Sequence, residues 1–363
     1  MFKHGAGMIG LLVSQLGAAG GTVSLIPLYQ PAAGAAPVAF AVGDFNRDGK
    51  PDLAVVDQRS ATVQVLRGVA NGYFEPWIEY AVGINPVAIV TGDFNGDGKL
   101  DLAVASQLSN TVTVLLGNGD GTFRSFTTLE AAGPTSLVAA DFNGDGRMDL
   151  AVSNASSNSV SLWLGLGEGT FRPAINFRVG ENPSFLAAGD FNGDGKLDLA
   201  VANLGSNNVS ILLGTGTGLF PAILNFAAGP APIGLALGDF NRDGKIDLAV
   251  LNATGSKSSG FMSTVSVLFG NGHGYFQPPI SFVAAAKGSF LIALDLNDDG
   301  KLDLAVTDPG SNSLKILLGL GNGFFEPPLS FAVGKGPAWI APFETGLIVA
   351  NSLSDSLSVL TNR

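Results

Sequence analysis

Six short segments of the chain place carboxylate and amide side chains at alternate positions. In the copy DFNGDGKLD, Asp93, Asn95, Asp97 and Asp101 occupy positions 1, 3, 5 and 9. Calcium takes six to eight hard oxygen ligands, which Asp and Asn on a tightly turning loop can supply. The pattern D-[FL]-N-x-D-G-x-x-D therefore predicts about six calcium sites, in loops that begin at Asp44, Asp93, Asp141, Asp190, Asp239 and Asp295.

The expected ligands of each site are the side chains at positions 1, 3, 5 and 9 and the backbone carbonyl of the basic residue at position 7. In chain order they are Asp44, Asn46, Asp48, Lys50, Asp52; Asp93, Asn95, Asp97, Lys99, Asp101; Asp141, Asn143, Asp145, Arg147, Asp149; Asp190, Asn192, Asp194, Lys196, Asp198; Asp239, Asn241, Asp243, Lys245, Asp247; and Asp295, Asn297, Asp299, Lys301, Asp303.

The first half of the loop matches an EF-hand, in which a glycine at position 6 permits a sharp turn. An EF-hand also needs a bidentate Glu at position 12 and flanking helices. Position 12 is Val in all six copies, for example Val104, and the preceding Leu-Ala favours a strand instead. The ninth-position Asp is therefore expected to close the coordination shell within a β-hairpin.

A turn without metal is the alternative, because Asp, Asn and Gly are good hairpin residues by themselves. Two observations favour metal. A two-residue turn needs only Asn-Gly, and three carboxylates within nine residues repel each other unless a cation lies among them. Magnesium is less expected than calcium because it rarely uses a cage made only of protein ligands.

The acidic residues of the chain are concentrated in these loops. The 363 residues include 30 Asp and Glu against 19 Lys and Arg, a net charge of −11, and six loops with three Asp each hold 18 of the 30. Six calcium ions would add twelve positive charges and leave about +1. The acidity is thus explained as ligand charge, and it argues against a nucleic-acid partner. The chain has no cysteine, so disulfides and thiolate chemistry are excluded.

The acidic loops recur at intervals of 49, 48, 49, 49 and 56 residues, which identifies a repeat protein. Each repeat contains four apolar runs divided by the acidic loop, a Ser/Asn turn and a Gly-rich turn, as expected of a four-stranded antiparallel meander. The runs are rich in Val, Leu and Ala on both faces and must be covered on both sides. Radially stacked blades of a β-propeller provide that cover.

We therefore predict an all-β, seven-bladed β-propeller of four-stranded antiparallel blades over residues 21–363. The seventh repeat, residues 336–360, has PFETG where the others have the acidic loop, and it stops after its third strand. The segment GTVSLIPLYQP (residues 21–31) matches a fourth strand, so an N-terminal strand is expected to complete the last blade and close the ring. Eight blades are the alternative if residues 8–16 also form a strand.

The acidic loop followed by Leu-Ala-Val, the period of about 49 residues, and segments such as FAVGKGPAWI (residues 331–340) and YAVGINPVAI (residues 80–89) resemble FG-GAP/VCBS repeats. The resemblance extends over residues 21–363. It implies the calcium-binding propeller of integrin α subunits and of many bacterial secreted proteins, with the Asp, Asn, Asp and Asp of each loop as ligands. It implies no metal in the last blade, where PFETG keeps none of the ligands.

Few side chains outside the loops could perform catalysis. The two histidines are His4, near the start, and His273, in the turn GNGHGYF, where a solvated turn residue is expected. The sequence has no G-x-S-x-G elbow and no phosphate-binding loop. The irregular segment Asn252–Ser263, which accounts for the 56-residue interval, is either a tolerated surface insertion or a ligand-binding loop.

These observations predict a non-catalytic binding or adhesion module for an unidentified protein or glycan, with calcium in a structural role and a monomeric propeller. The alternatives are a carbohydrate-active enzyme similar to polysaccharide lyases and a purely structural repeat unit. Residues 1–20 read either as a signal peptide, which would make the protein secreted or cell-surface, or as an eroded strand. Mean hydropathy is +0.34, but no apolar run of about 18 residues predicts membrane insertion.

Overall fold

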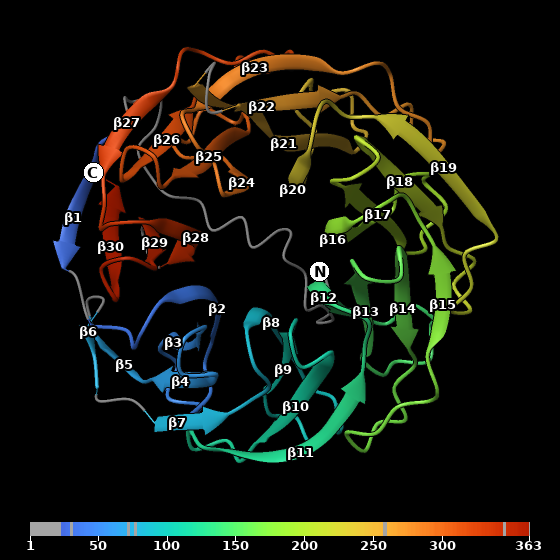
Figure 1. Ribbon diagram of the computed structural model, residues 1–363, viewed down its shortest axis with the longest axis vertical. Helices are drawn as coiled ribbons and strands as arrows, with labels where there is room; N and C mark the ends of the chain where they lie inside the picture. Colours follow the sequence, from blue (N-terminus) through green and yellow to red (C-terminus); the bar gives the residue numbers. More distant parts are fainter. Residues whose placement is uncertain are drawn as a thin grey trace.

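The computed structural model is a ring of seven four-stranded antiparallel sheets, the blades of a β-propeller (Figure 1). It describes residues 23–29, 32–70, 73–75, 78–256, 260–343 and 346–362. The described residues contain no helix, so they offer none that is long and apolar enough to span a membrane. The predicted fold class is confirmed, with seven blades. Residues 1–20, read as a signal peptide or a strand, lie outside the described residues.

The blades are numbered 1 to 7 in chain order, and the first strand of each lies nearest the centre of the ring (Figure 1). Blades 1 to 3 consist of β2 (Pro37–Gly43), β3 (Asp52–Asp57), β4 (Thr62–Leu66) and β7 (Ile78–Ala81); β8 (Pro86–Gly92), β9 (Asp101–Ser106), β10 (Thr111–Gly117) and β11 (Phe123–Glu130); and β12 (Pro134–Ala140), β13 (Asp149–Asn154), β14 (Ser159–Trp163) and β15 (Ile175–Arg178). A two-stranded ladder, β5 (Gly68–Ala70) and β6 (Tyr73–Phe74), accompanies blade 1.

Blades 4 to 7 follow the same order. They consist of β16 (Pro183–Gly189), β17 (Asp198–Asn203), β18 (Asn208–Leu213) and β19 (Ala222–Ala227); β20 (Pro232–Gly238), β21 (Asp247–Ser256), β22 (Gly260–Leu268) and β23 (Ile280–Ala285); β24 (Phe290–Leu294), β25 (Asp303–Asp308), β26 (Ser313–Leu317) and β27 (Leu329–Ala332); and β28 (Pro337–Phe343), β29 (Gly346–Asn351), β30 (Ser356–Asn362) and β1 (Leu25–Tyr29).

Burial across a blade follows the strand sequences. The second strand is apolar on both faces, and in β9 and β17 every residue is buried. The fourth strand alternates between partly buried and exposed residues, as β15 shows. A strand inside the ring lies between two neighbouring blades, whereas the outermost strand faces solvent on one side. The many apolar residues of the chain are thus buried between the blades of the ring.

The N-terminal strand closes the ring, as predicted. β1 pairs antiparallel with β30, with Leu25 opposite Asn362 and Ile26 opposite Thr361, so the outermost strand of blade 7 comes from the start of the chain. This closure gives the last blade its fourth strand and covers an edge that would otherwise be open to pairing with another chain.

The two ends of the ring carry different turns, because consecutive turns of a meander lie at opposite ends. The loop face carries the acidic loops, between strands one and two, and the turns between strands three and four. The opposite face carries the turns between strands two and three and the links from one blade to the next.

On the opposite face, a side-chain oxygen in one blade accepts a hydrogen bond from the backbone of the next blade. We call this bond the clasp. Its acceptor residue has a left-handed backbone, with φ of 50–57° at five positions, which Asn and Asp tolerate better than most residues. The Oδ1 atoms accept from amides at 2.7–3.0 Å in four places: Asn110 from Gly133, Asn158 from Asn182, Asn207 from Ala231, and Asn312 from Gly336.

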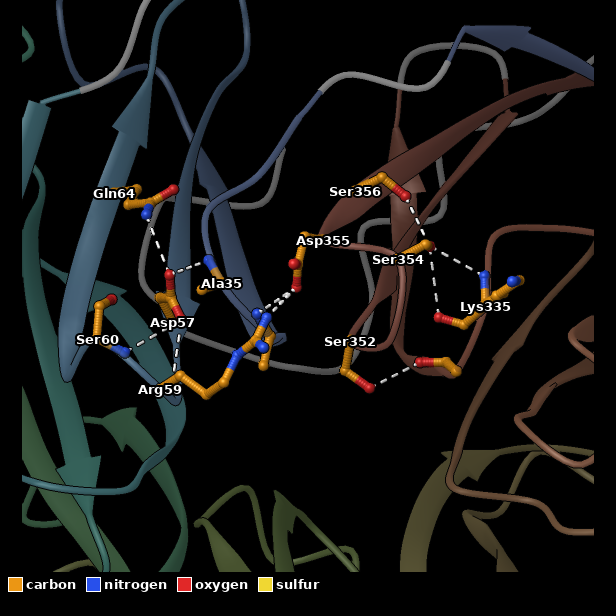
Figure 2. Close-up of polar contacts among 12 residues, drawn as sticks. Ala35, Asp57, Arg59, Ser60, Gln64, Lys335, Ser352, Ser354, Asp355 and Ser356 are labelled. Atoms are coloured by element: carbon orange, nitrogen blue, oxygen red, sulfur yellow. Dashed lines mark hydrogen bonds and ion pairs between the residues drawn. The ribbon is translucent and has the colours of Figure 1, made fainter.

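The clasp between blades 7 and 1 is charged. Asp355 stands where other blades have Asn, and its Oδ1 accepts from the Ala36 amide at 2.8 Å and from the Arg59 guanidinium at 2.5 Å (Figure 2). Asp57, at the end of β3, accepts hydrogen bonds from the Ala35 and Arg59 amides and so holds the same segment (Figure 2). An ion pair thus joins the first and last blades.

Removing the Asp355 side chain should destabilise the protein more than removing an uncharged clasp. Asp355→Ala deletes both the hydrogen bond to the Ala36 amide and the exposed ion pair with Arg59. Asn207→Ala, the matched control, deletes only the hydrogen bond, and both variants leave Ala in a left-handed conformation. Asp355→Asn should keep the clasp hydrogen bond and lose only the ion pair with Arg59, whose contribution to stability depends on salt. Urea unfolding at low and high salt measures these differences, and equal losses in Asp355→Asn and Asp355→Ala would contradict the assignment.

Candidate functional site

Each acidic loop connects the first and second strands of blades 1 to 6. In the loop after β8, the Asp93 carboxylate lies beneath the turn: Oδ1 accepts from the Gly96 amide at 2.7 Å and the Asp97 amide at 3.1 Å, and Oδ2 accepts from the Gly98 amide at 2.8 Å. Gly96 and Gly98 have φ of 75° and 77°, which glycine adopts without steric cost. The position 1 carboxylate therefore shapes the loop.

The side chains at positions 3, 5 and 7 follow the same local pattern. Asn95 Oδ1 accepts from the Asp97 amide at 2.9 Å, and Asp97 Oδ1 accepts from the Lys99 amide at 3.0 Å. The Lys99 ammonium lies 3.0 Å from the other oxygen of Asp97. Burial acts to raise the pKa of Asp97, but the bonds from Lys99 outweigh it, and the pKa is lowered. The Asp97 residue is exposed.

The position 9 aspartate is fully buried and lies at the start of the second strand. Asp101 Oδ2 accepts from the Phe94 amide and Oδ1 from the Gly117 amide, both at 2.8 Å. A Cβ atom at Gly117 would lie 2.2 Å from the Leu100 carbonyl oxygen, so only glycine fits there. The same pair of amide bonds is made by the position 9 aspartates of the other five loops: Asp52, Asp149, Asp198, Asp247 and Asp303.

This buried carboxylate is electrostatically unfavourable when ionised. Burial raises the pKa of Asp101 to about 6, helped by repulsion from Asp93 and Asp97 and opposed by the two amide bonds. The pKa is also raised to about 6, by burial first, at Asp149, Asp198, Asp247 and Asp303, and it is raised at Asp52. A cation in the loop would relieve this repulsion.

The chemistry of the loop fits calcium, because its donors are all hard oxygens and each carboxylate oxygen that accepts one amide bond retains a second lone pair. Within the described residues, however, no three carboxylate or histidine side chains are grouped closely enough to hold a metal ion. The ligand roles predicted for the thirty loop residues stay predictions.

The pKa shifts predict how the calcium-free protein responds to pH. A carboxyl group whose pKa is raised on folding binds more protons in the folded state, so its contribution to stability is lost as pH rises through the folded pKa. The melting temperature without calcium should therefore fall between about pH 4.5 and pH 7, because five aspartates have a folded pKa of about 6. Thermal unfolding of metal-stripped protein tests this, and a rising melting temperature over that range would contradict it.

The residue at position 2 of the loop connects one blade to the next. The Phe94 carbonyl accepts from the Gly169 amide of blade 3 at 2.9 Å, and the Phe94 ring packs 6.0 Å from the Phe171 ring. The same carbonyl bond and ring contact recur for Phe45, Phe142, Phe191 and Phe240, with ring centroids 5.3–6.1 Å apart. We call this arrangement the phenylalanine clamp.

Truncating one clamp should cost much of the stability of the fold. Phe142 is 2% exposed and packs edge-on against Phe220, so Phe142→Ala should destabilise the protein by about 3–5 kcal/mol. Leu108→Ala is the control, because Leu108 is 69% exposed, and it should change stability by less than about 0.5 kcal/mol. Urea unfolding measures both. A loss below about 1 kcal/mol in Phe142→Ala would show that the clamp is not a stabilising contact.

The other segments singled out in the sequence have clear places in the fold. Asn252–Ser263 extends β21 and β22 beyond the neighbouring strands as a longer hairpin, with Ala253 opposite Ser263. Residues 257–259 lie outside the described residues, so a ligand-binding role for this segment stays a prediction.

His273 is exposed in the turn before the fourth strand of blade 5, where its amide donates to Asn271 Oδ1. In blade 7, Phe343 pairs directly with Gly346, which leaves no acidic loop between β28 and β29.

A model of the FG-GAP-like repeat matches the sequence in four overlapping copies, at residues 44–104, 93–152, 141–201 and 190–250. Together these copies span residues 44–250, more than half of the 363-residue chain. The chain belongs to the FG-GAP-like repeat family. Each matched segment runs from one acidic loop to the strand after the next, so the repeat pattern confirms the resemblance predicted from the loops. No curated protein matches the sequence.

Solved structures share the propeller fold of this FG-GAP-like protein at low sequence identity. BBS1N in complex with ARL6DN is 14% identical, with a TM-score of 0.65 over 93% of this chain and 97% of that one. A putative 6-phosphogluconolactonase from Bacteroides uniformis is 15% identical, with a TM-score of 0.62 over 84% and 87%. An Agrocybe aegerita lectin that recognises non-reducing terminal N-acetylglucosamine is 17% identical, with a TM-score of 0.54 over 81% and 80%. Such identities show the fold alone.

Two sets of contact residues in this FG-GAP-like chain lie outside the sites predicted from the sequence. The phenylalanine at position 2 of five loops recurs together with a second recurring Phe in the following repeat, which is a signal of packing between blades. The clasp residues lie just before the third strand of their blades, which is the signal that they contact the next blade.

Proposed function

We propose that this protein is a calcium-stabilised, non-catalytic binding module, secreted or at the cell surface, that recognises a protein or a carbohydrate. Calcium has a structural role in this proposal, with about six ions in the loops of blades 1 to 6. The FG-GAP-like fold supports a binding or structural module. Calcium, location and ligand are inferred from the loops and from the sequence.

One observation carries the structural role of calcium. The Phe94 amide donates to the buried Asp101 carboxylate, and the Phe94 carbonyl accepts from Gly169 of the next blade. A cation held by Asp93, Asp97 and Asp101 would therefore order the same short loop that holds two blades together. Because this arrangement recurs in five loops, calcium would stabilise the ring at each of them.

A catalytic role has less support. The buried aspartates, which have the raised pKa values that acid–base catalysis often uses, accept two backbone amide bonds each and lie in separate blades. His273, in an exposed turn, is the only histidine in the described residues. The polysaccharide-lyase alternative and the similarity to structures named as putative 6-phosphogluconolactonases rest on the fold, which hosts many functions.

Calcium should raise the melting temperature of the metal-stripped protein by about 10 °C or more. Each site that binds only the folded state adds about 2.7 kcal/mol when calcium is present at about 100 times its dissociation constant, and about six sites act together. Differential scanning calorimetry with added calcium, and elemental analysis of the dialysed protein, measure the stabilisation and the number of ions. An unchanged melting curve with no bound metal would sink the calcium proposal.

A single-loop variant tests whether the sites act separately. Asp97→Ala should lower the calcium content by one ion and leave the other five sites, because the contacts of a repeat are mostly with its neighbours. Asp120→Ala is the matched control, because Asp120 is an exposed aspartate in a turn on the same face of blade 2. Loss of all bound calcium in Asp97→Ala, or loss of an ion in Asp120→Ala, would contradict the assignment of one ion to each loop.

A further inference from the structure

A cleft of about 620 Å³, lined by both polar and apolar side chains, opens between blades 2 and 3, at the outer part of the ring. One wall is the end of β11 with Glu130, and the other is formed by β14 and β15 with Ser159, Ser161, Asn176 and Arg178. Ser157, in the turn before β14, and three alanines complete the lining. Its volume lies in the range of about 300–1,000 Å³ that is typical of small-molecule sites.

A directed chain of hydrogen bonds leads from the core of blade 3 to this cleft. The fully buried Asn154 donates through Nδ2 to Ser161 Oγ at 2.8 Å, and Ser161 Oγ donates to Asn176 Oδ1 at 2.6 Å. The carbonyl oxygen of Asn176 accepts this bond, which leaves its NH₂ group as a donor and one lone pair on the oxygen for a ligand. The chain therefore orients Asn176 from behind through two buried side chains.

The two charges of the cleft occupy the same strand position in adjacent blades. Glu130 lies opposite Thr111 at the end of β11, and Arg178 lies opposite Ser159 at the end of β15. The corresponding position in the other five blades is apolar: Ala81, Ala227, Val283, Ala332 and Ala32. The repeat therefore departs from its pattern here, and it departs by adding one carboxylate and one guanidinium to one cleft.

These charges are not used by the fold. Within the described residues, no carboxylate lies within the 4.0 Å of an ion pair from the Arg178 guanidinium, Glu130 included. Both side chains are exposed. A guanidinium binds a carboxylate through two parallel hydrogen bonds. The other polar side chains suit the hydroxyl groups of a ligand: Asn176 can donate a hydrogen bond to them, Glu130 can accept one, and Ser157 can do either.

We propose that this cleft binds a sugar acid, with its carboxylate on Arg178 and its hydroxyl groups on Asn176, Ser157 and Glu130. The proposal rests on the proposed function as a binding module and names its ligand class. A neutral sugar fits less well, because it has no carboxylate to pair with the Arg178 guanidinium. The alanines leave room for the ring, and the open side of the cleft suits a residue at the end of a longer glycan.

The test is calorimetric titration of the full chain with galacturonic acid, its neutral methyl ester and galactose, at one fixed calcium concentration. Galacturonic acid should bind saturably, and the ester and galactose should bind at least about tenfold more weakly, because each lacks the carboxylate. Arg178→Ala places at this position the residue that four other blades have, and it should weaken galacturonic acid binding by about tenfold or more. Arg172→Ala is the matched control, since Arg172 is an exposed arginine of blade 3 outside the cleft.

The melting temperatures of both variants should equal that of the unchanged protein, which separates loss of binding from loss of folding. No saturable binding of galacturonic acid, equal binding of its methyl ester, or unchanged binding in Arg178→Ala would each overturn the proposal. Calcium stabilisation is measured independently, so calcium could be confirmed while the cleft fails this test. Failure of the calcium measurements would instead contradict the calcium part of the proposed function, whatever the cleft binds.

Discussion

The bond from the Phe94 amide to the buried Asp101 carboxylate is the contact on which the ring depends, together with its equivalents in five other loops. That carboxylate fixes the start of the second strand and the turn before the fourth strand, through Gly117. The same Phe94 then contacts the next blade through its carbonyl and its ring. Order within a blade and order between blades are therefore set by one short loop.

This arrangement explains why an acidic sequence can form a large apolar structure. The ionised aspartates cost free energy where they are buried, as their raised pKa values show, but they hold backbone amides that would otherwise lack partners. Cations in the loops would offset the cost. The aspartates of these loops thus supply most of the negative charge of the chain and also bind backbone amides inside the ring.

Much of the fold could be predicted from the sequence, because repetition shows the same pattern six times. The acidic loop, the doubly buried strand such as Asp101–Ser106, and the missing fourth strand of the last repeat were enough to predict seven blades and N-terminal closure. Contacts between blades could not be predicted. Phe94 and Phe171 are distant in sequence and pack together only because the ring places blades 2 and 3 side by side. Glu130 and Arg178 line one cleft for the same reason.

The clasp has a consequence for how the ring would open. Blade 1 has Ala61 at the clasp position, with the same left-handed backbone but no side-chain acceptor, whereas blade 7 has the charged Asp355. The couplings between neighbouring blades are therefore unequal, although the blades themselves are alike. Transient opening of the ring should occur most often between blades 1 and 2. There the backbone amide hydrogens on the opposite face would exchange with solvent sooner than the equivalent amide hydrogens of other blades. A nearly symmetric architecture thus has a preferred point of entry for solvent.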